Sequence, residues 1–245
     1  MSGHSKWSTI KRKKGAADAK RSKIFSRIVK EIIIAARDGS DPEMNPGLRM
    51  AISNAKGVNM PKENILRAIS KAESDGSNFD EVTFEGYGPG GIAIFVECLT
   101  DNNNRTVSNV RSIFNKRGGN LGTNGSLSFL FNRKGVFTIP KSELDPEELE
   151  LELIDAGIEE FEVESDIFIV TCALEDFGNV QKKLEEMNIE PESAELQRIP
   201  NNTKKLDVET AKSVLGLIET FEEDDDIQNI FHNLEMTDEL EKALE

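Results

Sequence analysis

The sequence predicts an α+β protein in which an N-terminal helical domain is followed by two ferredoxin-like α/β sandwich domains, one inserted in the other. Three features of the 245-residue chain support this prediction. Apolar residues recur at helical spacing before residue 72, they alternate with polar residues from residue 79, and residues 135–199 follow the order βαββαβ. The predicted domains are residues 1–78, residues 79–134 together with 205–238, and residues 135–204.

The helical domain is expected to hold three helices. In the first, at residues 20–37, apolar side chains share one broad face and most basic side chains lie opposite. The second covers about residues 48–56 with Gly57 as its C-terminal cap, and the third covers about residues 62–72. The connector at 38–47 is too long and too rich in proline for the tight turn of a DNA-binding helix-turn-helix, so no such motif is expected.

The middle domain is expected to begin with a β-hairpin. Strands at residues 81–85 and 92–99 flank a glycine-rich turn. The run Asp101-Asn102-Asn103-Asn104 offers N-cap chemistry for a helix that ends at Gly118, and a further strand covers residues 127–131.

The insert alternates strands and helices in the split βαβ order. Its expected elements are a strand at 136–139, a helix at 146–156, strands at 160–163 and 167–172, a helix at 176–187 and a strand at 195–199. After the insert, a helix at about 208–221 and a strand at 227–232 complete the sandwich of the middle domain. Residues 235–245 are expected to form a polar tail.

Charge is divided unevenly along the chain. The net charge is +10 over residues 1–71, −1 over residues 72–134 and −24 over residues 135–245, within a total of −15. A block of like charges repels itself unless a polyanion neutralises it, and an acidic body is repelled by nucleic acid. We therefore expect the basic N-terminal part to face a polyanion.

The basic N-terminal segment supplies the first candidate nucleic-acid contacts. Residues 1–37 hold eleven Lys or Arg against two acids, and the chain's one tryptophan, Trp7, follows Lys6. Lysine and arginine neutralise phosphates, whereas an aromatic ring stacks on bases. From charge alone, a solvated helix face or arm is an equally good interpretation. The predicted contacts are His4, Lys6, Trp7, Lys11, Arg12, Lys13, Lys14, Lys20, Lys23, Arg27 and Lys30.

A second candidate cluster lies in the middle domain. Here the start of the predicted helix and the glycine-rich residues 118–125 would present backbone N–H groups to phosphate oxygens. Ordinary capping and turn chemistry is the alternative explanation. The cations of this cluster are Arg105, Arg111, Lys116 and Arg117.

No catalytic, metal or cofactor site is predicted. The histidines, His4 and His232, and the cysteines, Cys98 and Cys172, fit no zinc spacing, and the thiols are expected to be buried and free. The glycine-rich turn at 86–91 joins two strands and lacks the Lys-Ser/Thr ending of a P-loop. Because no apolar run reaches membrane-spanning length and no secretory signal is recognised, we expect a cytoplasmic monomer without a membrane partner.

Motifs along the whole chain resemble the YebC family in order and spacing. They are Gly3-His4-Ser5-Lys6-Trp7, Ile10-Lys11 with Lys14, Asp18-Ala19-Lys20-Arg21 with Lys23 and Phe25, Asn45-Pro46 with Leu48-Arg49, Asn59-Met60-Pro61, Tyr87-Gly88-Pro89-Gly90-Gly91, Asp101-Asn102, Asn104-Arg105-Thr106 and Gly118-Gly119-Asn120-Leu121-Gly122. Two positions depart from the family pattern, since Asn103 stands where an arginine is common and Asn124 where an aspartate is common.

The resemblance implies a three-domain protein of the bacterial cytoplasm, helical first and then α/β. Members are described as DNA-binding transcriptional regulators, mitochondrial relatives act as translational activators, and bacterial members are also linked to helping ribosomes past difficult sequences. It supplies no catalytic residues.

We therefore expect a non-enzymatic nucleic-acid-binding regulator of gene expression, in the first instance a DNA-binding transcriptional regulator. A ribosome-associated translation factor that binds ribosomal RNA is the close alternative. An alternative of another class is an acidic protein-interaction scaffold whose basic segment docks on its own body. In the main hypothesis the acidic domains position the basic segment or bind a protein partner.

Overall fold

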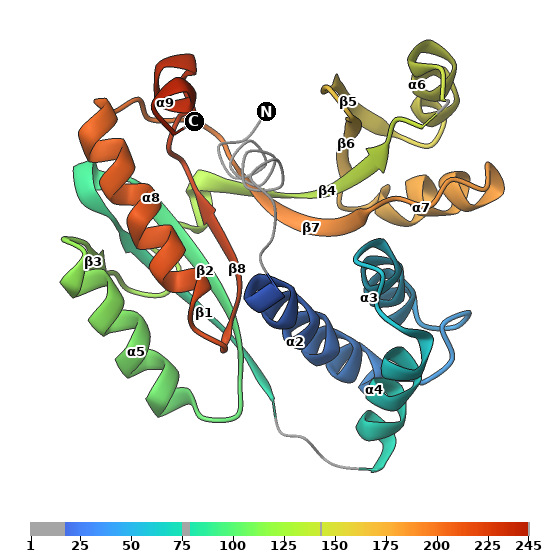
Figure 1. Cartoon of the computed structure of the whole chain (residues 1–245), viewed down its shortest axis with the longest axis horizontal. Helices are drawn as coiled ribbons and strands as arrows, with labels where there is room; N and C mark the ends of the chain where they lie inside the picture. Colours follow the sequence, from blue (N-terminus) through green and yellow to red (C-terminus); the bar gives the residue numbers. More distant parts are fainter. Residues whose placement is uncertain (1–17, 75–78, 143, 245) are drawn as a thin grey trace. The chain divides into compact units, whose positions relative to one another are not determined.

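The computed structural model describes residues 18–74, 79–142 and 144–244 of the chain. These residues form two compact units (Figure 1). One contains residues 18–23, 79–132 and 199–244, and the other contains residues 24–74, 133–142 and 144–198. The prediction of N-terminal helices followed by two α/β sandwiches, one interrupted by the other, is confirmed. Most of the predicted helical domain, residues 24–74, falls within the same compact unit as most of the predicted insert.

The first unit is built on a four-stranded antiparallel sheet. Its strands are β1 (Asp80–Tyr87), β2 (Ala93–Thr100), β3 (Asn120–Leu121) and β8 (Ile227–His232), in the order β3-β1-β2-β8. The hairpin of β1 and β2 was expected, and its tight corner contains the short 3₁₀ helix Pro89–Gly91. Helices α5 (Asn103–Lys116) and α8 (Val208–Glu222) lie side by side over one face of the sheet (Figure 1).

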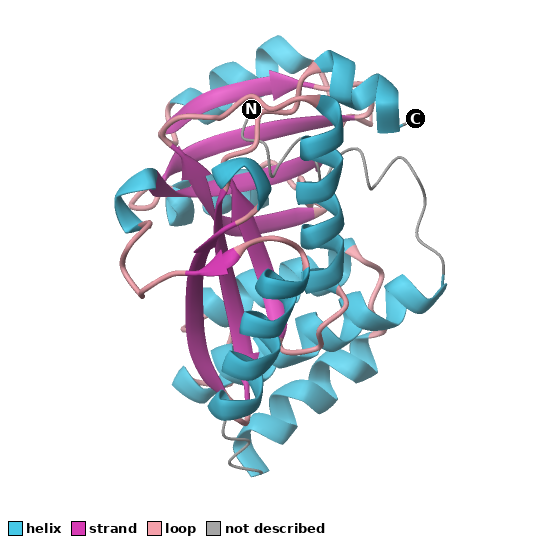
Figure 2. Cartoon of the chain, turned by 90° about the vertical axis from the view of Figure 1, so that its left-hand side faces the viewer, coloured by secondary structure: helices cyan, strands magenta, loops and turns pink. Residues whose placement is uncertain are grey.

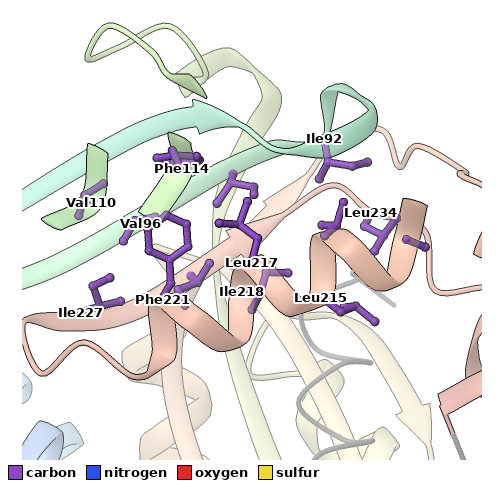
Figure 3. Close-up of a cluster of buried hydrophobic side chains, with 14 of the residues drawn as sticks. Ile92, Val96, Val110, Phe114, Leu215, Leu217, Ile218, Phe221, Ile227 and Leu234 are labelled. Carbon is purple, nitrogen blue, oxygen red and sulfur yellow. The ribbon is translucent and has the colours of Figure 1, made fainter. Parts of the chain in front are cut away.

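The core of this unit lies between that sheet and its two helices. Val96 from β2 packs among apolar side chains from both helices, and the rings of Phe114 and Phe221 meet edge to face at 4.9 Å between centroids (Figure 3). The C-terminal residues also enter this core. Helix α9 (Asp238–Leu244) buries Leu240, which is 2% exposed, so the prediction of a polar tail was wrong there. A helix of seven residues, about two turns, buries too few apolar side chains to show a clear period in the sequence.

The predicted strand at 127–131 was also wrong. Residues Ser128–Leu130 form a 3₁₀ turn, and the two residues of β3 occupy the sheet edge instead. Leu127 and Phe131 are buried because they cover the second face of the sheet, against Phe95 and Phe231. Their apolar pattern therefore reflects a loop packed on a sheet rather than a strand within it.

The second unit contains the predicted ferredoxin-like arrangement. Strands β4 (Phe131–Pro140), β5 (Ile158–Val163), β6 (Ile167–Ala173) and β7 (Ser193–Pro200) form an antiparallel sheet in the order β5-β6-β4-β7. Helices α6 (Pro146–Ile154) and α7 (Phe177–Glu186) pack on the face that carries Phe137, Phe168 and Val170. Figure 2 shows the strands of the chain in magenta with the helices beside them. The strand order is the one that two split βαβ crossovers produce.

The N-terminal helices are α2 (Asp18–Ala35), α3 (Pro46–Gly57) and α4 (Lys62–Ser74), with a short 3₁₀ helix at Ala36–Asp38. The buried Asn45 fastens the connector between α2 and α3. Its side-chain oxygen accepts a hydrogen bond from the backbone N–H of Leu48, and its amide donates to the backbone oxygens of Ala35 and Gly39 at 2.6 and 2.7 Å. An asparagine cap followed by a proline at the first helical position explains why α3 begins where it does.

The end of α3 differs from the prediction, because Gly57 is its last helical residue and not its cap. The left-handed residue is Asn59, with φ of 57°. Met60 donates its backbone N–H to the oxygen of Ala55, and Asn59 donates to Lys56. This pair of hydrogen bonds is the Schellman arrangement, in which asparagine is the usual substitute for glycine.

Gly57 is required for a different reason. A Cβ atom at this position would lie 1.8 Å from the backbone oxygen of Glu192, in the segment that leads into β7. One turn earlier, the side-chain oxygen of the buried Asn54 accepts the backbone N–H of Ala194 at 2.8 Å. Helix α3 is thus held against the backbone of the second sheet by a close approach and a buried hydrogen bond.

Candidate nucleic-acid interface

The most open cationic surface among the described N-terminal helices is the outer face of α4. Lys62, Arg67 and Lys71 are exposed around the outer half of this helix, together with Glu63, while Ile65 and Ala68 are buried. No ion pair or hydrogen bond of these three cationic side chains occurs within the part of the chain that the structure describes. Unpaired cations on a helix that is packed along one side are available to a polyanion.

Helix α4 follows α3 after only four residues, 58–61. The Schellman turn at Asn59 makes this connection tight. Two helices joined by a three- or four-residue turn are the connectivity of a helix-turn-helix, in which the second helix is presented to a nucleic acid. The 38–47 connector is long, as predicted, and the tight connection lies at 58–61, where the sequence also placed the short link between the second and third helices. Sequence analysis missed the three cations of α4, which form no continuous run.

The basic stripe predicted on α2 is less accessible. Lys23, Arg27 and Lys30 are each half-buried, and Arg27 and Lys30 already interact with other groups of the chain. Other predicted contacts, His4, Lys6, Trp7, Lys11, Arg12, Lys13, Lys14 and the side chain of Lys20, lie outside the described residues.

A glutamate interrupts the same stripe. Burial raises the pKa of the half-buried Glu31 to about 7; repulsion by Glu195 of β7 adds to this increase, and attraction by Arg27 opposes it. Because the folded protein favours the protonated form, Glu31 contributes stability that is fully present below its unfolded pKa near 4.5 and is lost as the pH rises through 7.

Glu31→Gln should therefore make the protein more stable than the parent at pH 8 but not at pH 4.5. The expected gain at pH 8 is about 2–3 kcal/mol, because the pKa rises from 4.5 to about 7. Urea unfolding of both proteins at the two pH values measures it. Glu63→Gln on the exposed face of α4 is the matched control, and an equal response from both variants would contradict the prediction.

The helix start in the middle-domain cluster is already neutralised by the protein. Arg105 donates to both carboxylate oxygens of Asp226, at 2.7 to 3.2 Å, and to Asp101 at 2.8 Å. Asp226 is buried and also accepts the hydroxyl groups of Thr100 and Thr106, at 3.3 and 2.9 Å. Here Arg105 fastens α5 to the segment before β8, and its charge is compensated by two carboxylates although its side chain is 45% exposed.

The glycine-rich segment that follows α5 closes on itself. Gly119 donates its N–H to the oxygen of Phe114, and Gly122 donates to the backbone oxygen of Glu85. The carboxylate of Glu85, which is 3% exposed, accepts the N–H groups of Gly125 and Leu127. These N–H groups are therefore not available to a ligand, as the alternative of ordinary turn chemistry requires. Sequence analysis missed Glu85, which lies in a strand and signals no loop contact.

The other end of α5 is different. Arg111, Lys116 and Arg117 are exposed, and in the described part of the chain their side chains make no ion pair or hydrogen bond. These three cations, together with those of α4, are the candidate contacts that the described structure leaves open.

Two models of one protein family match almost the whole chain. The model described as "TACO1/YebC protein N-terminal domain" matches residues 5–75, and that of the "TACO1/YebC second and third domain" matches residues 79–234. The chain belongs to the TACO1/YebC family. The resemblance that the sequence motifs indicated is thereby confirmed.

Relatives of this TACO1/YebC chain are similar over their full length. A "Probable transcriptional regulatory protein" of Amoebophilus asiaticus is 52% identical over 96% of this chain and 98% of its own. The "Probable transcriptional regulatory protein YrbC" of Bacillus subtilis is 48% identical over 95% and 99%. The crystal structure of a conserved hypothetical protein from Aquifex aeolicus has a TM-score of 0.82 and 44% identity, and the match covers 90% of this chain and 93% of that one.

The cysteines of this TACO1/YebC member lie in the interior of the protein. Cys98 and Cys172 are buried free thiols, as predicted, and burial raises the pKa of Cys172 to about 11, so it stays a protonated thiol. Within the described ranges, no group of three or more His, Cys, Asp or Glu is placed to hold a metal ion. In those same ranges no helix has the length and apolar character to span a bilayer.

Proposed function

We propose that this chain is a nucleic-acid-binding regulator of gene expression, and that the outer face of α4 contacts phosphates. The exposed and unpaired Lys62, Arg67 and Lys71 on the second helix of a tight helix–turn–helix carry this proposal. The names of the curated relatives support a regulatory role. The basic residues of the N-terminal segment would add further phosphate contacts, and the acidic remainder would keep the rest of the protein away from the polyanion.

DNA is the target that the α4 geometry favours. A helix presented after a tight turn suits the major groove, and the exposed Arg67 is of the residue type that hydrogen-bonds to the edge of guanine. The protein would act as a cytoplasmic monomer that regulates transcription. A ribosome-bound translation factor is the second candidate, favoured by the presence of open cations on both units, on α4 and at the end of α5, because contacts to phosphates alone do not read a base sequence.

The triple charge reversal Lys62→Glu, Arg67→Glu and Lys71→Glu should weaken binding to a labelled random duplex at least tenfold. The salt dependence should also become shallower. Each lost phosphate contact should reduce the magnitude of the slope of log affinity against log salt by roughly 0.9, so three contacts should reduce it by about 2 to 3. Thermal stability should change little because exposed charges contribute little to it. Fluorescence anisotropy across a salt series measures both quantities.

The control is a triple reversal of exposed lysines elsewhere, at Lys182, Lys212 and Lys242. It changes the net charge by the same amount, so equal loss of binding in both triple variants would contradict a contact at α4. The scaffold alternative predicts a different result. If the parent binds no nucleic acid and the α4 variant loses thermal stability, the basic surface binds the acidic part of the same chain.

Competition decides between DNA and the ribosome. Labelled random duplex, a promoter duplex from the neighbourhood of the gene and purified ribosomes are titrated against one another at near-physiological salt. Specific DNA-binding proteins usually prefer their sites by about 10³ or more. A preference of less than about tenfold for the promoter, with firm ribosome binding, would replace the transcriptional proposal by the translational one.

A further inference from the structure

A cleft of about 570 Å³ lies within the second unit, between α3 and α7. Its volume is in the range of small-molecule sites, about 300–1,000 Å³. Helix α3 contributes one wall, and α7 with the loop that follows contributes the other. The lining side chains used below are Arg49, Ile52, Gln181, Leu184, Glu185 and Ile189.

Two polar side chains line this cleft without a partner. Gln181 on α7 is 8% exposed, and Arg49 on α3 is half-buried. Neither side chain makes a hydrogen bond or ion pair with any group in the described ranges of the chain. The amide atoms of Gln181 are accessible to solvent, and the half-buried guanidinium of Arg49 has no carboxylate partner in the described ranges. The guanidinium of Arg49 on the α3 wall and the amide of Gln181 on the α7 wall are therefore available to a molecule in the cleft.

The electrostatic character changes along the cleft. Arg49 lies near the beginning of α3, whereas α3 and α7 both end at the far side, with Asn59 and Asn188 as their left-handed terminal residues. Helix C-termini carry partial negative charge, and the exposed Glu185 adds a full one. Lys56 at that end is paired with Glu190 at 3.5 Å, so its charge is already compensated.

We propose that the cleft binds a small zwitterion, such as a lysine-containing dipeptide, with its carboxylate on Arg49 and its ammonium toward Glu185. Seven residues of helix separate Arg49 from Lys56, about 10 Å at 1.5 Å per residue, which matches an elongated ligand. Ile52, Leu184 and Ile189 contact its aliphatic part, and Gln181 hydrogen-bonds to its peptide group. Glu185 and Glu190 repel polyanions, so this site is distinct from the nucleic-acid surface. The proposal of a zwitterion site therefore does not depend on the proposed function.

The probes are free L-lysine, Gly-Lys, Lys-Ala and Lys-Ala-Ala, each titrated into the full-length ¹⁵N-labelled protein. The comparison set contains the same molecules acetylated on every amine, the same molecules amidated at the carboxylate, and inorganic phosphate. We expect at least one zwitterion to bind with a Kd below about 1 mM and to shift the side-chain N–H signals of Arg49 and Gln181. Its acetylated and amidated forms should bind at least tenfold more weakly.

Variants locate the binding. Arg49→Gln should weaken it at least tenfold and Gln181→Leu at least threefold, while Arg49→Lys should retain most of it. Lys182→Gln, one residue along α7 and outside the cleft, should leave it unchanged. The proposal is overturned if no zwitterion binds below 1 mM, if phosphate or the acetylated forms bind as well as the zwitterions, or if Arg49→Gln and Lys182→Gln behave alike.

Discussion

Asp226→Ala is expected to lower the free energy of unfolding by about 2–4 kcal/mol, because it removes a buried carboxylate that one guanidinium and two buried hydroxyl groups share. Asp226 accepts from the Arg105 guanidinium and from the hydroxyls of Thr100 and Thr106. The aspartate side chain is 8% exposed and the arginine 45%, so the guanidinium regains water on substitution whereas the threonine hydroxyls do not. Urea unfolding followed by circular dichroism measures the loss.

Asp101→Ala is the matched control, since Asp101 pairs with the same guanidinium at 2.8 Å but is 60% exposed. Exposed pairs contribute at most about 1 kcal/mol, and its removal should stay within that range. Asp226→Asn keeps the side-chain volume and one acceptor oxygen. Its free energy of unfolding should fall by about half as much as that of the alanine variant. If the loss of unfolding free energy for Asp226→Ala is no larger than that for Asp101→Ala, the Asp226 carboxylate does not hold α5 in place. In that case Arg105 returns to the set of candidate phosphate contacts.

Gly57→Ala is expected to destabilise the second unit by about 2–4 kcal/mol, because the added methyl group meets backbone rather than a movable side chain. The Cβ atom would lie 1.8 Å from the oxygen of Glu192 and 2.6 Å from its carbonyl carbon. To relieve this contact, α3 has to move away from the segment before β7, which also breaks the hydrogen bond between Asn54 and Ala194. Hydrogen exchange at the Ala194 amide should accelerate together with the loss of stability.

Gly216→Ala is the control for this variant. Gly216 also lies inside a helix, α8, but an added Cβ would meet nothing within 4 Å. Alanine is a better helix former than glycine by roughly 0.5–1 kcal/mol, so this variant should be slightly more stable than the parent. A small gain at both positions would show that α3 does not depend on the close approach of Glu192.

Much of the local structure is determined by the sequence itself. The periods of apolar residues placed α2, α5, α8 and both β-hairpins to within a few residues, because a helix or strand that buries one face repeats its apolar side chains at a constant spacing. The cap of α5 was also predictable, since the Asn102 side chain accepts from the N–H of Arg105 only three residues away. The order of strands and helices in the insert likewise implied its sheet order.

The tertiary structure decided the partners of these elements. Whether Arg105 faces solvent or a carboxylate depends on Asp226, 121 residues later, and the need for glycine at position 57 depends on Glu192, 135 residues later. The accessible face of α4 and the unpaired Arg49 and Gln181 also follow from which surfaces pack together. Spacing along a chain reports local hydrogen bonds and burial of one face, whereas a contact between distant residues exists only after the backbone has brought them within a few ångströms.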